Sequence, residues 1–266
     1  MRLKDKVAVV LGASAEGGTG WAIAEALAEE GAKVVVAARR IEPLQELAKN
    51  IGGKAIACDG GKEADIKALA KFTEDSYGKI DIAVNSAALP TLMMIKDAEE
   101  GALQKALDVN YLGHVYFVKY VTERMNDGGS ITLISSNSTT QPQPPHFAYA
   151  CAKSATDCLV RYAAMEYGHR GIRVNSLLPG PIKSALAKHM YEIPGVEHVM
   201  SRNVPLQRIG LPKDYADTVV FLSGPTYITG VNMPVSGGNH LTGMPRPDEF
   251  PAEMGIDVYA DPNAKW

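Results

Sequence analysis

A tyrosine and a lysine four residues apart are the first candidates for chemistry in this sequence. Tyr149 and Lys153 lie in a segment expected to form a helix over 148–167, and side chains four apart share a helix face, with Cβ atoms about 5–6 Å apart. An ammonium this close would lower the pKa of the Tyr149 hydroxyl from about 10, so that it can exchange a proton with an alcohol or carbonyl oxygen. Ser136, thirteen residues earlier, can donate to the same oxygen from the end of an expected strand. Ser138 is the alternative donor.

Four glycines fall within the nine residues that follow the first apolar run, Val7–Leu11. A glycine turn that opens a helix lets backbone N–H groups approach a diphosphate, and the helix N-terminus favours the negative charge. The turn therefore predicts a dinucleotide site. The expected contacts are Gly12, Ser14, Gly18, Thr19 and Gly20.

The second apolar run, 33–38, ends in Arg39 and Arg40. NAD sites carry an acidic residue near this point, which bonds the adenine ribose, and none is present here. A guanidinium is suited to a 2′-phosphate. The pair favours NADP, with Arg39 as the main contact and Arg40 as the second, and NAD remains the alternative. Asp59 and Asn85 follow the third and fourth apolar runs, where parallel sheets bind ligands.

These residues are placed by a regular alternation of short apolar runs and helical segments. Parallel strands need crossover helices, and right-handed crossovers put helices on both sheet faces. We therefore expect an α/β fold, a doubly wound, mostly parallel, Rossmann-like sheet of about seven strands. The strands are expected at 7–11, 33–38, 54–58, 80–84, 130–134, 172–177 and 231–235. The helices are expected at 21–30, 43–50, 63–77, 148–167 and 212–222, with one long or two broken helices in 98–125.

Composition excludes several classes of protein. The chain has 266 residues, of which 46% are hydrophobic and 21% charged, as in ordinary globular proteins. The net charge of −3 gives no basic field for nucleic acid or anionic lipid. No run approaches the ~18 apolar residues of a membrane helix. Three cysteines without metal-site spacing predict free thiols, no metal and a cytoplasmic location.

Over residues 5–240 the sequence resembles the short-chain dehydrogenase/reductase family. The resemblance implies hydride transfer between NADP(H) and a secondary alcohol or ketone, a small hydroxy or keto substrate. It also implies a homodimer or homotetramer paired through helices at about 103–125 and 148–167. The matching pieces are the glycine-rich turn, Asp59, Asn85-Ser86-Ala87-Ala88, Asn110, Ser136, Tyr149, Lys153 and Pro179-Gly180.

The resemblance also implies a role for each residue. Tyr149 would be the acid/base, Lys153 would lower its pKa and bind the nicotinamide ribose, and Ser136 would polarise the reacting oxygen. Asn110 would hold a water that links Lys153 to solvent. Asp59 would meet the adenine and Asn85 would support the cofactor. The nicotinamide pocket would be shaped by Pro179, Gly180 and Ile182, and segment 181–208 would cover the substrate.

One of the departures from the family pattern bears on the reaction. The glycine turn is two residues longer than usual, as in the enoyl reductase branch, whose active tyrosine lies seven residues before the lysine. His146 holds that position here, so the enoyl reaction lacks its acid. The alternatives to an oxidoreductase remain a nucleotide-sensing binding protein and a lyase or epimerase on the same fold. His114, in an apolar helix, is expected to be a core histidine.

The last 26 residues, 241–266, differ from the rest of the chain. They carry five acids and two bases, and this net charge of −3 equals that of the whole chain. The sequence thus predicts one domain over 1–240 and an acidic, proline-rich extension. We expect the extension to pack on its own or a neighbouring subunit, near segment 181–208.

Overall fold

The structure is a computed structural model, and it describes residues 1–245 and 249. Of the acidic extension expected over 241–266, residues 246–248 and 250–266 lie outside the described residues. The organisation of 1–240 as a single domain therefore remains an expectation.

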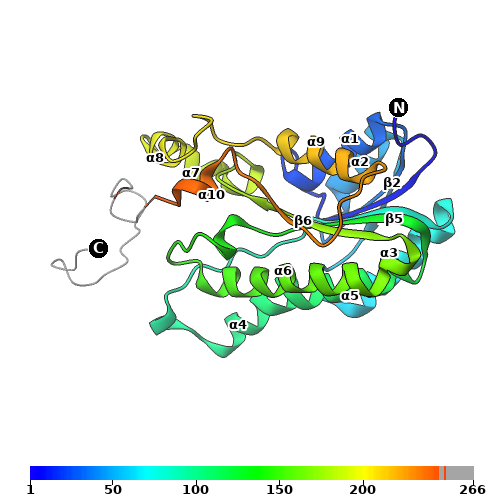
Figure 1. The fold of residues 1–266 in the computed structure, drawn as a ribbon, viewed down its shortest axis with the longest axis horizontal. Coiled ribbons are helices and arrows are strands. Elements are labelled where there is room, and N and C mark those ends of the chain that lie inside the picture. Colours follow the sequence, from blue (N-terminus) through cyan, green and yellow to red (C-terminus); the bar gives the residue numbers. More distant parts are fainter. Residues whose placement is uncertain (246–248, 250–266) are drawn as a thin grey trace.

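Seven parallel strands form one central sheet in the order β3-β2-β1-β4-β5-β6-β7 (Figure 1). Because β1 is hydrogen-bonded to both β2 and β4, the strand order reverses direction beside β1, the position at which doubly wound sheets bind ligands. The predicted fold class is confirmed. The strands are β1 (Val7–Leu11), β2 (Lys33–Ala38), β3 (Lys54–Ala57), β4 (Ile80–Asn85), β5 (Met125–Ile134), β6 (Arg173–Pro179) and β7 (Asn232–Val235).

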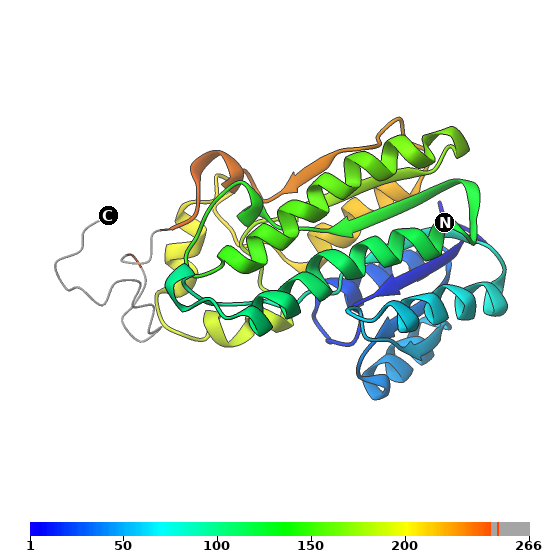
Figure 2. The same cartoon turned by 90° about the horizontal axis from the view of Figure 1, so that it is seen from below.

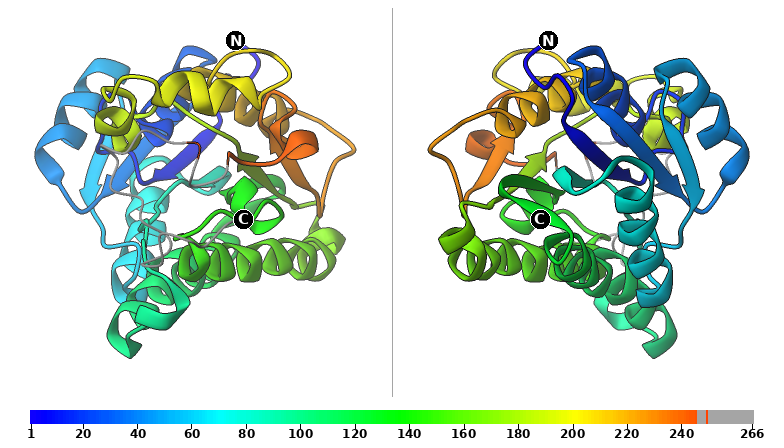
Figure 3. Two further views of the ribbon diagram at one scale, coloured as in Figure 1. Left: turned by 90° about the vertical axis from the view of Figure 1, so that its left-hand side faces the viewer. Right: turned by 90° about the vertical axis from the view of Figure 1, so that its right-hand side faces the viewer.

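Helices α1 (Thr19–Glu29), α2 (Ile41–Ile51) and α9 (Pro212–Ser223) cover one face of the sheet. Figure 3 shows them as a blue and gold layer on the opposite side of the sheet from the green helices. Each buries an apolar stripe, for example Ile23, Leu27 and Val219, against the side chains that β1 and β2 point to this face. Alternating strand residues thus supply this core and the core of the other face.

The opposite face is covered by α3 (Glu63–Tyr77), α5 (Gly113–Thr122) and α6 (Phe147–Tyr167). Figure 2 shows α5 and α6 side by side along the sheet. The region 98–125 contains two α-helices, α4 (Glu100–Leu107) and α5, joined by a π-helical turn at Asp108–Leu112. Of the two options from the sequence, the broken helix is the one observed, and the break contains Asn110.

Two strand boundaries differ by two or more residues from those predicted, and the others agree to within one residue. Strand β5 begins at Met125 rather than 130, because Met125 pairs with Ile80 before the register shifts at Ile82. Strand β6 extends to Pro179, which pairs with Val235 on β7. These extensions bring Pro179 into the regular sheet, directly before Gly180.

Segment 181–208 forms a separate group of short helices at one end of the molecule (Figure 1). It contains the turn Ala185–Ala187, α7 (Lys188–Tyr191) and α8 (Val196–Arg202), and it has its own apolar cluster around Val196, Met200 and Ile209. Beyond α10 (Asn239–Thr242), Met244 packs on this cluster and Glu249 pairs with Arg202. In the part of the chain that the structure describes, no helix is both long and apolar enough to cross a membrane.

Candidate active site

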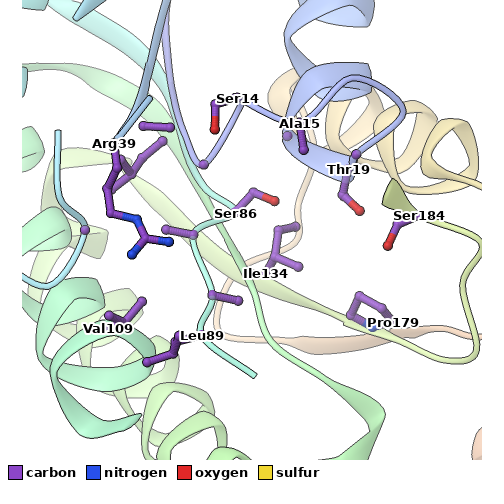
Figure 4. Close-up of a pocket in the computed structure, with 18 of the residues that line it drawn as sticks. Ser14, Ala15, Thr19, Arg39, Ser86, Leu89, Val109, Ile134, Pro179 and Ser184 are labelled. Carbon is purple, nitrogen blue, oxygen red and sulfur yellow. The ribbon is translucent and has the colours of Figure 1, made fainter. Parts of the chain in front are cut away.

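A cleft of about 670 Å³ opens along the carboxyl ends of the strands (Figure 4). Its walls come from the turns that follow β1, β2, β3 and β4 and from the ends of β5 and β6. Ser136 and Tyr149 lie in the same lining as the glycine turn. The expected cofactor residues in the lining are Gly12, Ser14, Gly18, Thr19, Gly20, Arg39, Arg40, Asp59, Tyr149, Pro179, Gly180 and Ile182.

The glycine turn is held in a form that only small residues permit. Gly12 has φ +93°, and a Cβ added there would lie 2.5 Å from the backbone nitrogen of Ala87. The N-terminus of α1 has no side-chain cap at Gly18 and no acidic residue in its first turn. Its backbone N–H groups and the positive end of its dipole therefore face the cleft unneutralised, as a diphosphate requires. The residues present fit the predicted dinucleotide at this end of the cleft.

Two exposed arginines stand at the end of β2. Arg40 donates a hydrogen bond from Nη2 to the Ser14 carbonyl, 3.0 Å away, and so ties the β2 end to the glycine turn. The Arg39 side chain extends over the cleft in Figure 4. Asp59 is an acidic residue of the cleft lining, and its carboxylate accepts a hydrogen bond from Gly61 N at 3.0 Å.

Two buried asparagines fix the segment 85–90, which forms part of the cleft wall. Asn85 Oδ1 accepts a hydrogen bond from Ala87 N at 3.0 Å. Asn110 clamps Leu89 from both sides, because its Oδ1 accepts from Leu89 N at 3.0 Å and its Nδ2 donates to Leu89 O at 2.9 Å. The Asn110 carbonyl accepts from Thr156 Oγ1 at 2.7 Å. Both side chains therefore hold the backbone of the wall, behind the surface of the cleft.

Ser136 and Tyr149 approach the cleft from β5 and α6. Ser136 Oγ accepts hydrogen bonds from Ser138 N at 3.2 Å and Ser138 Oγ at 2.9 Å. A further interaction of the Ser136 hydroxyl with Tyr149 favours the phenolate. Burial outweighs it and raises the pKa of Tyr149 to about 12. Ser136 thus lies between the two other hydroxyl groups, and Ser138 orients it.

Lys153 is fully buried beside this pair. Its Nζ donates to the Ile134 carbonyl at 2.7 Å, lies 3.3 Å from His114 Nε2, and is 5.8 Å from the centroid of the Tyr149 ring. Burial lowers the pKa of Lys153 to about 7, against the attraction of Asp157. Loss of hydration thus dominates the pKa of both side chains, and Nζ bonds the Ile134 carbonyl and contacts His114. The lowering of the Tyr149 pKa that the spacing of Lys153 predicts remains an expectation.

The structure shows contacts at the site that the sequence did not predict. Ser184 lines the cleft from segment 181–208. Asp157, one helical turn after Lys153, is buried and bonds Ser176 Oγ at 3.4 Å. Its spacing of four from Lys153 on the same helix is the signal that could have found it. His114 had no such local signal, because it contacts Lys153 across two helices.

The comparisons with known proteins agree with this geometry. Residues 12–240 match the family model described as enoyl-(acyl carrier protein) reductase. The chain is 33% identical over 246 residues to dehydrogenase/reductase SDR family member 4 of Homo sapiens, covering 89% of this chain and 88% of that protein. The chain belongs to the short-chain dehydrogenase/reductase family.

Other members of the short-chain dehydrogenase/reductase family support the same assignment. The chain is 33% identical over 251 residues to 7alpha-hydroxysteroid dehydrogenase of Escherichia coli strain K12, covering 90% of this chain and 95% of that protein. A short-chain dehydrogenase/reductase mutant from Serratia marcescens has a TM-score of 0.83 at 31% identity, covering 90% of this chain and all of that one. The protein is therefore an oxidoreductase of a family that uses NAD or NADP and acts on small molecules.

Proposed function

We propose that this protein transfers a hydride between NADP(H) and a secondary alcohol or ketone, with Tyr149 as the acid/base. One observation carries the proposal: Tyr149 and Ser136 line the same cleft as the glycine turn and Arg39. A proton donor and a dinucleotide cradle therefore face one cavity. The 7alpha-hydroxysteroid dehydrogenase to which the chain is similar acts, by its name, on a hydroxyl group.

The residues divide the work of the reaction. The nicotinamide supplies or accepts the hydride when the cofactor is bound. Tyr149 delivers the proton to the carbonyl oxygen, or removes it from the alcohol, and Ser136 donates a hydrogen bond to the same oxygen. The Lys153 ammonium favours the phenolate of Tyr149 and bonds the nicotinamide ribose. Asn110 supports the wall of the cleft and holds the water that links Lys153 to solvent.

Cofactor choice rests on the charges at the end of β2. Arg39 offers a planar fork to a 2′-phosphate, and Arg40, held against Ser14, adds a second positive charge. Asp59 meets the adenine, and Asn85 supports the cofactor from the end of β4. Pro179, Gly180 and Ile182 shape the nicotinamide pocket. NADP is therefore favoured over NAD.

The substrate enters beneath segment 181–208. Met190, Tyr191 and Ile193 of this segment pack on the cluster of Val196 and Met200, so the interior of the cover is apolar. Apolar covers of this kind suit ring-bearing or acyl substrates better than sugars. The substrate class we propose is an apolar secondary alcohol or the corresponding ketone.

The test is a substrate panel followed by nicotinamide absorbance, with wild type and Tyr149→Phe. We expect Tyr149→Phe to lower kcat by about 10²–10⁴-fold and to change the Kd for NADPH far less, because the aromatic ring is kept. Wild-type rates in this variant would contradict the role of Tyr149. Cofactor binding without turnover would favour the sensing protein, and turnover without a net absorbance change would favour the lyase or epimerase. Turnover confined to conjugated C=C bonds would favour an enoyl reductase.

Assembly and compartment complete the proposal. We place the protein in the cytoplasm as a homodimer or homotetramer that pairs α4–α5 and α6 with the same helices of another copy. Tyr162 and Met165 of α6 are exposed apolar side chains that such pairing would cover. Cys58, Cys151 and Cys158 are unpaired, in keeping with a reducing compartment. A monomeric mass in light scattering would contradict the proposed homodimer or homotetramer.

A further inference from the structure

His114 lies in the apolar part of α5 and has no exposed surface. Its neighbours on the helix, Phe117, Val118 and Val121, all belong to the core beneath the sheet. Within the described residues, the ring makes one hydrogen-bond contact of normal geometry, between Nε2 and Lys153 Nζ, which are 3.3 Å apart. The other ring nitrogen, Nδ1, has no hydrogen-bond partner of normal geometry there.

Packing alone does not account for a histidine at this position. A buried polar group without a partner is costly, and leucine would fill a similar volume with no polar atom to satisfy. The imidazole therefore stays in the core at a cost, and the group it contacts is the ammonium nearest to Tyr149. This pairing indicates a role connected with Lys153.

The protonation of the pair follows from its surroundings. Burial holds the pKa of His114 well below its usual value, Lys153 acts in the same direction, and only a backbone interaction with Ala87 opposes them. The ring is thus neutral near pH 7. Charged Lys153 has three protons to donate and no lone pair, so Nε2 accepts from it, and the ring proton is then on Nδ1.

We propose that His114 is a positioning residue for Lys153: its Nε2 accepts a hydrogen bond from the ammonium and, with the Ile134 carbonyl, keeps Nζ charged and oriented beside Tyr149. This proposal rests on the proposed function, because it concerns how the Tyr149 phenolate is stabilised. It adds a residue from α5 to the group that α6 and β5 supply.

If His114 has this role, it helps to set the pH profile of the activity. The titratable groups around Lys153 are Tyr149 and Asp157 on α6 and His114 on α5. Asp157 attracts the ammonium, although burial raises its own pKa. If the acceptor at His114 is lost, the charged form of Lys153 is less favoured and the Tyr149 phenolate loses its nearest cation. The pH at which alcohol oxidation reaches half its maximum should then rise.

Two substitutions separate hydrogen bonding from packing. His114→Gln places an amide acceptor close to the position of Nε2, and His114→Leu fills the volume without an acceptor. We expect His114→Leu to shift the pH profile of kcat by about one unit toward alkaline pH, and to lower kcat at neutral pH more than it changes KM. His114→Gln should restore the profile to within a few tenths of a unit. Wild-type profiles in both variants, or equal shifts in both, would overturn the proposal.

A second measurement needs no turnover and so stands if the proposed function fails. Nitrogen NMR of the imidazole, assigned by its loss in His114→Gln, reports the tautomer and charge of the ring. We expect a neutral ring protonated at Nδ1 from about pH 5 to 8, with an Nε2 resonance that moves in Lys153→Met. A ring that titrates near its ordinary pKa, or that is protonated on Nε2, would overturn the proposal whether or not a substrate has been found.

Discussion

Replacing Arg39 by aspartate should reverse the choice between NADP and NAD. The Arg39 side chain is exposed and extends over the cleft at the end of β2. Aspartate at this position would repel a 2′-phosphate and could accept hydrogen bonds from the ribose hydroxyls of NAD. The free enzyme should fold as before, because an exposed side chain at a strand end contributes little to the free energy of unfolding.

The size of the effect follows from two contributions. Loss of a charge-assisted, bidentate contact to phosphate costs about 1.5–3 kcal/mol. Repulsion between the new carboxylate and the phosphate adds about 1 kcal/mol for groups that are exposed to water. The sum of about 2.5–4 kcal/mol lowers the ratio of kcat/KM for NADP to that for NAD by roughly two to three orders of magnitude.

The assay measures kcat/KM with each cofactor at one fixed substrate concentration. Lys33→Asp is the matched control, because it reverses an exposed positive charge at the opposite end of the same strand, about 20 Å from Arg39 and beyond the screening length. The control should leave the ratio unchanged. Arg40→Ala should lower it by less than Arg39→Asp. An unchanged ratio in Arg39→Asp would refute the assignment of Arg39 as the selector.

Three further perturbations test the framework around the site. Gly12→Ala should lower the free energy of unfolding by about 2–4 kcal/mol and weaken cofactor binding, because the added Cβ meets the Ala87 backbone at a positive φ. Urea unfolding measures the first effect and NADPH titration the second. Wild-type values in both would contradict the contact. The Lys153→Met variant should have a higher free energy of unfolding than wild type at low pH. This difference should shrink as pH rises from about 7 to 10.5, because the wild type becomes more stable where its unfolded chain binds a proton that the folded protein has lost. Urea unfolding at acid and alkaline pH checks it, and a constant difference would show that burial of the charge is not the cause. Truncation after Thr242 removes Met244 from the apolar cover and should raise the substrate KM and lower the thermal midpoint; unchanged values would show the extension to be idle.

The parts of the site that depend on a single helix or strand could be predicted from the sequence. Tyr149 and Lys153 share a helix face because of helical periodicity, and the glycine turn follows β1 because a buried apolar run ends at Leu11. The parallel sheet with helices on both faces also follows, since each βα unit crosses over with one hand. Local periodicity and chain chirality are therefore enough for the fold class and for the frame of the cleft.

Contacts between distant elements could not be predicted in this way. His114 is 39 residues from Lys153, and only the packing of α5 against α6 brings them together. The clamp of Asn110 on Leu89 depends likewise on the π-helical turn that interrupts α4 and α5. In both cases the sequence shows a polar residue in an apolar helix, and only the fold shows its partner.

The direction in which the pKa of Tyr149 is shifted shows why residue spacing alone does not predict the electrostatics of the site. Helical spacing places a cation near the phenol, but it does not say how much water surrounds either group. In the structure, burial raises the pKa of Tyr149 to about 12 and lowers that of Lys153 to about 7, so each group alone favours its neutral form. The charged pair that the proposed reaction needs must be stabilised by nearby acceptors and donors. Ile134 and His114 serve Lys153, and Ser136 serves Tyr149. In the proposed reaction, the reactivity of Tyr149 therefore depends on these three neighbours as much as on the lysine four residues along the helix.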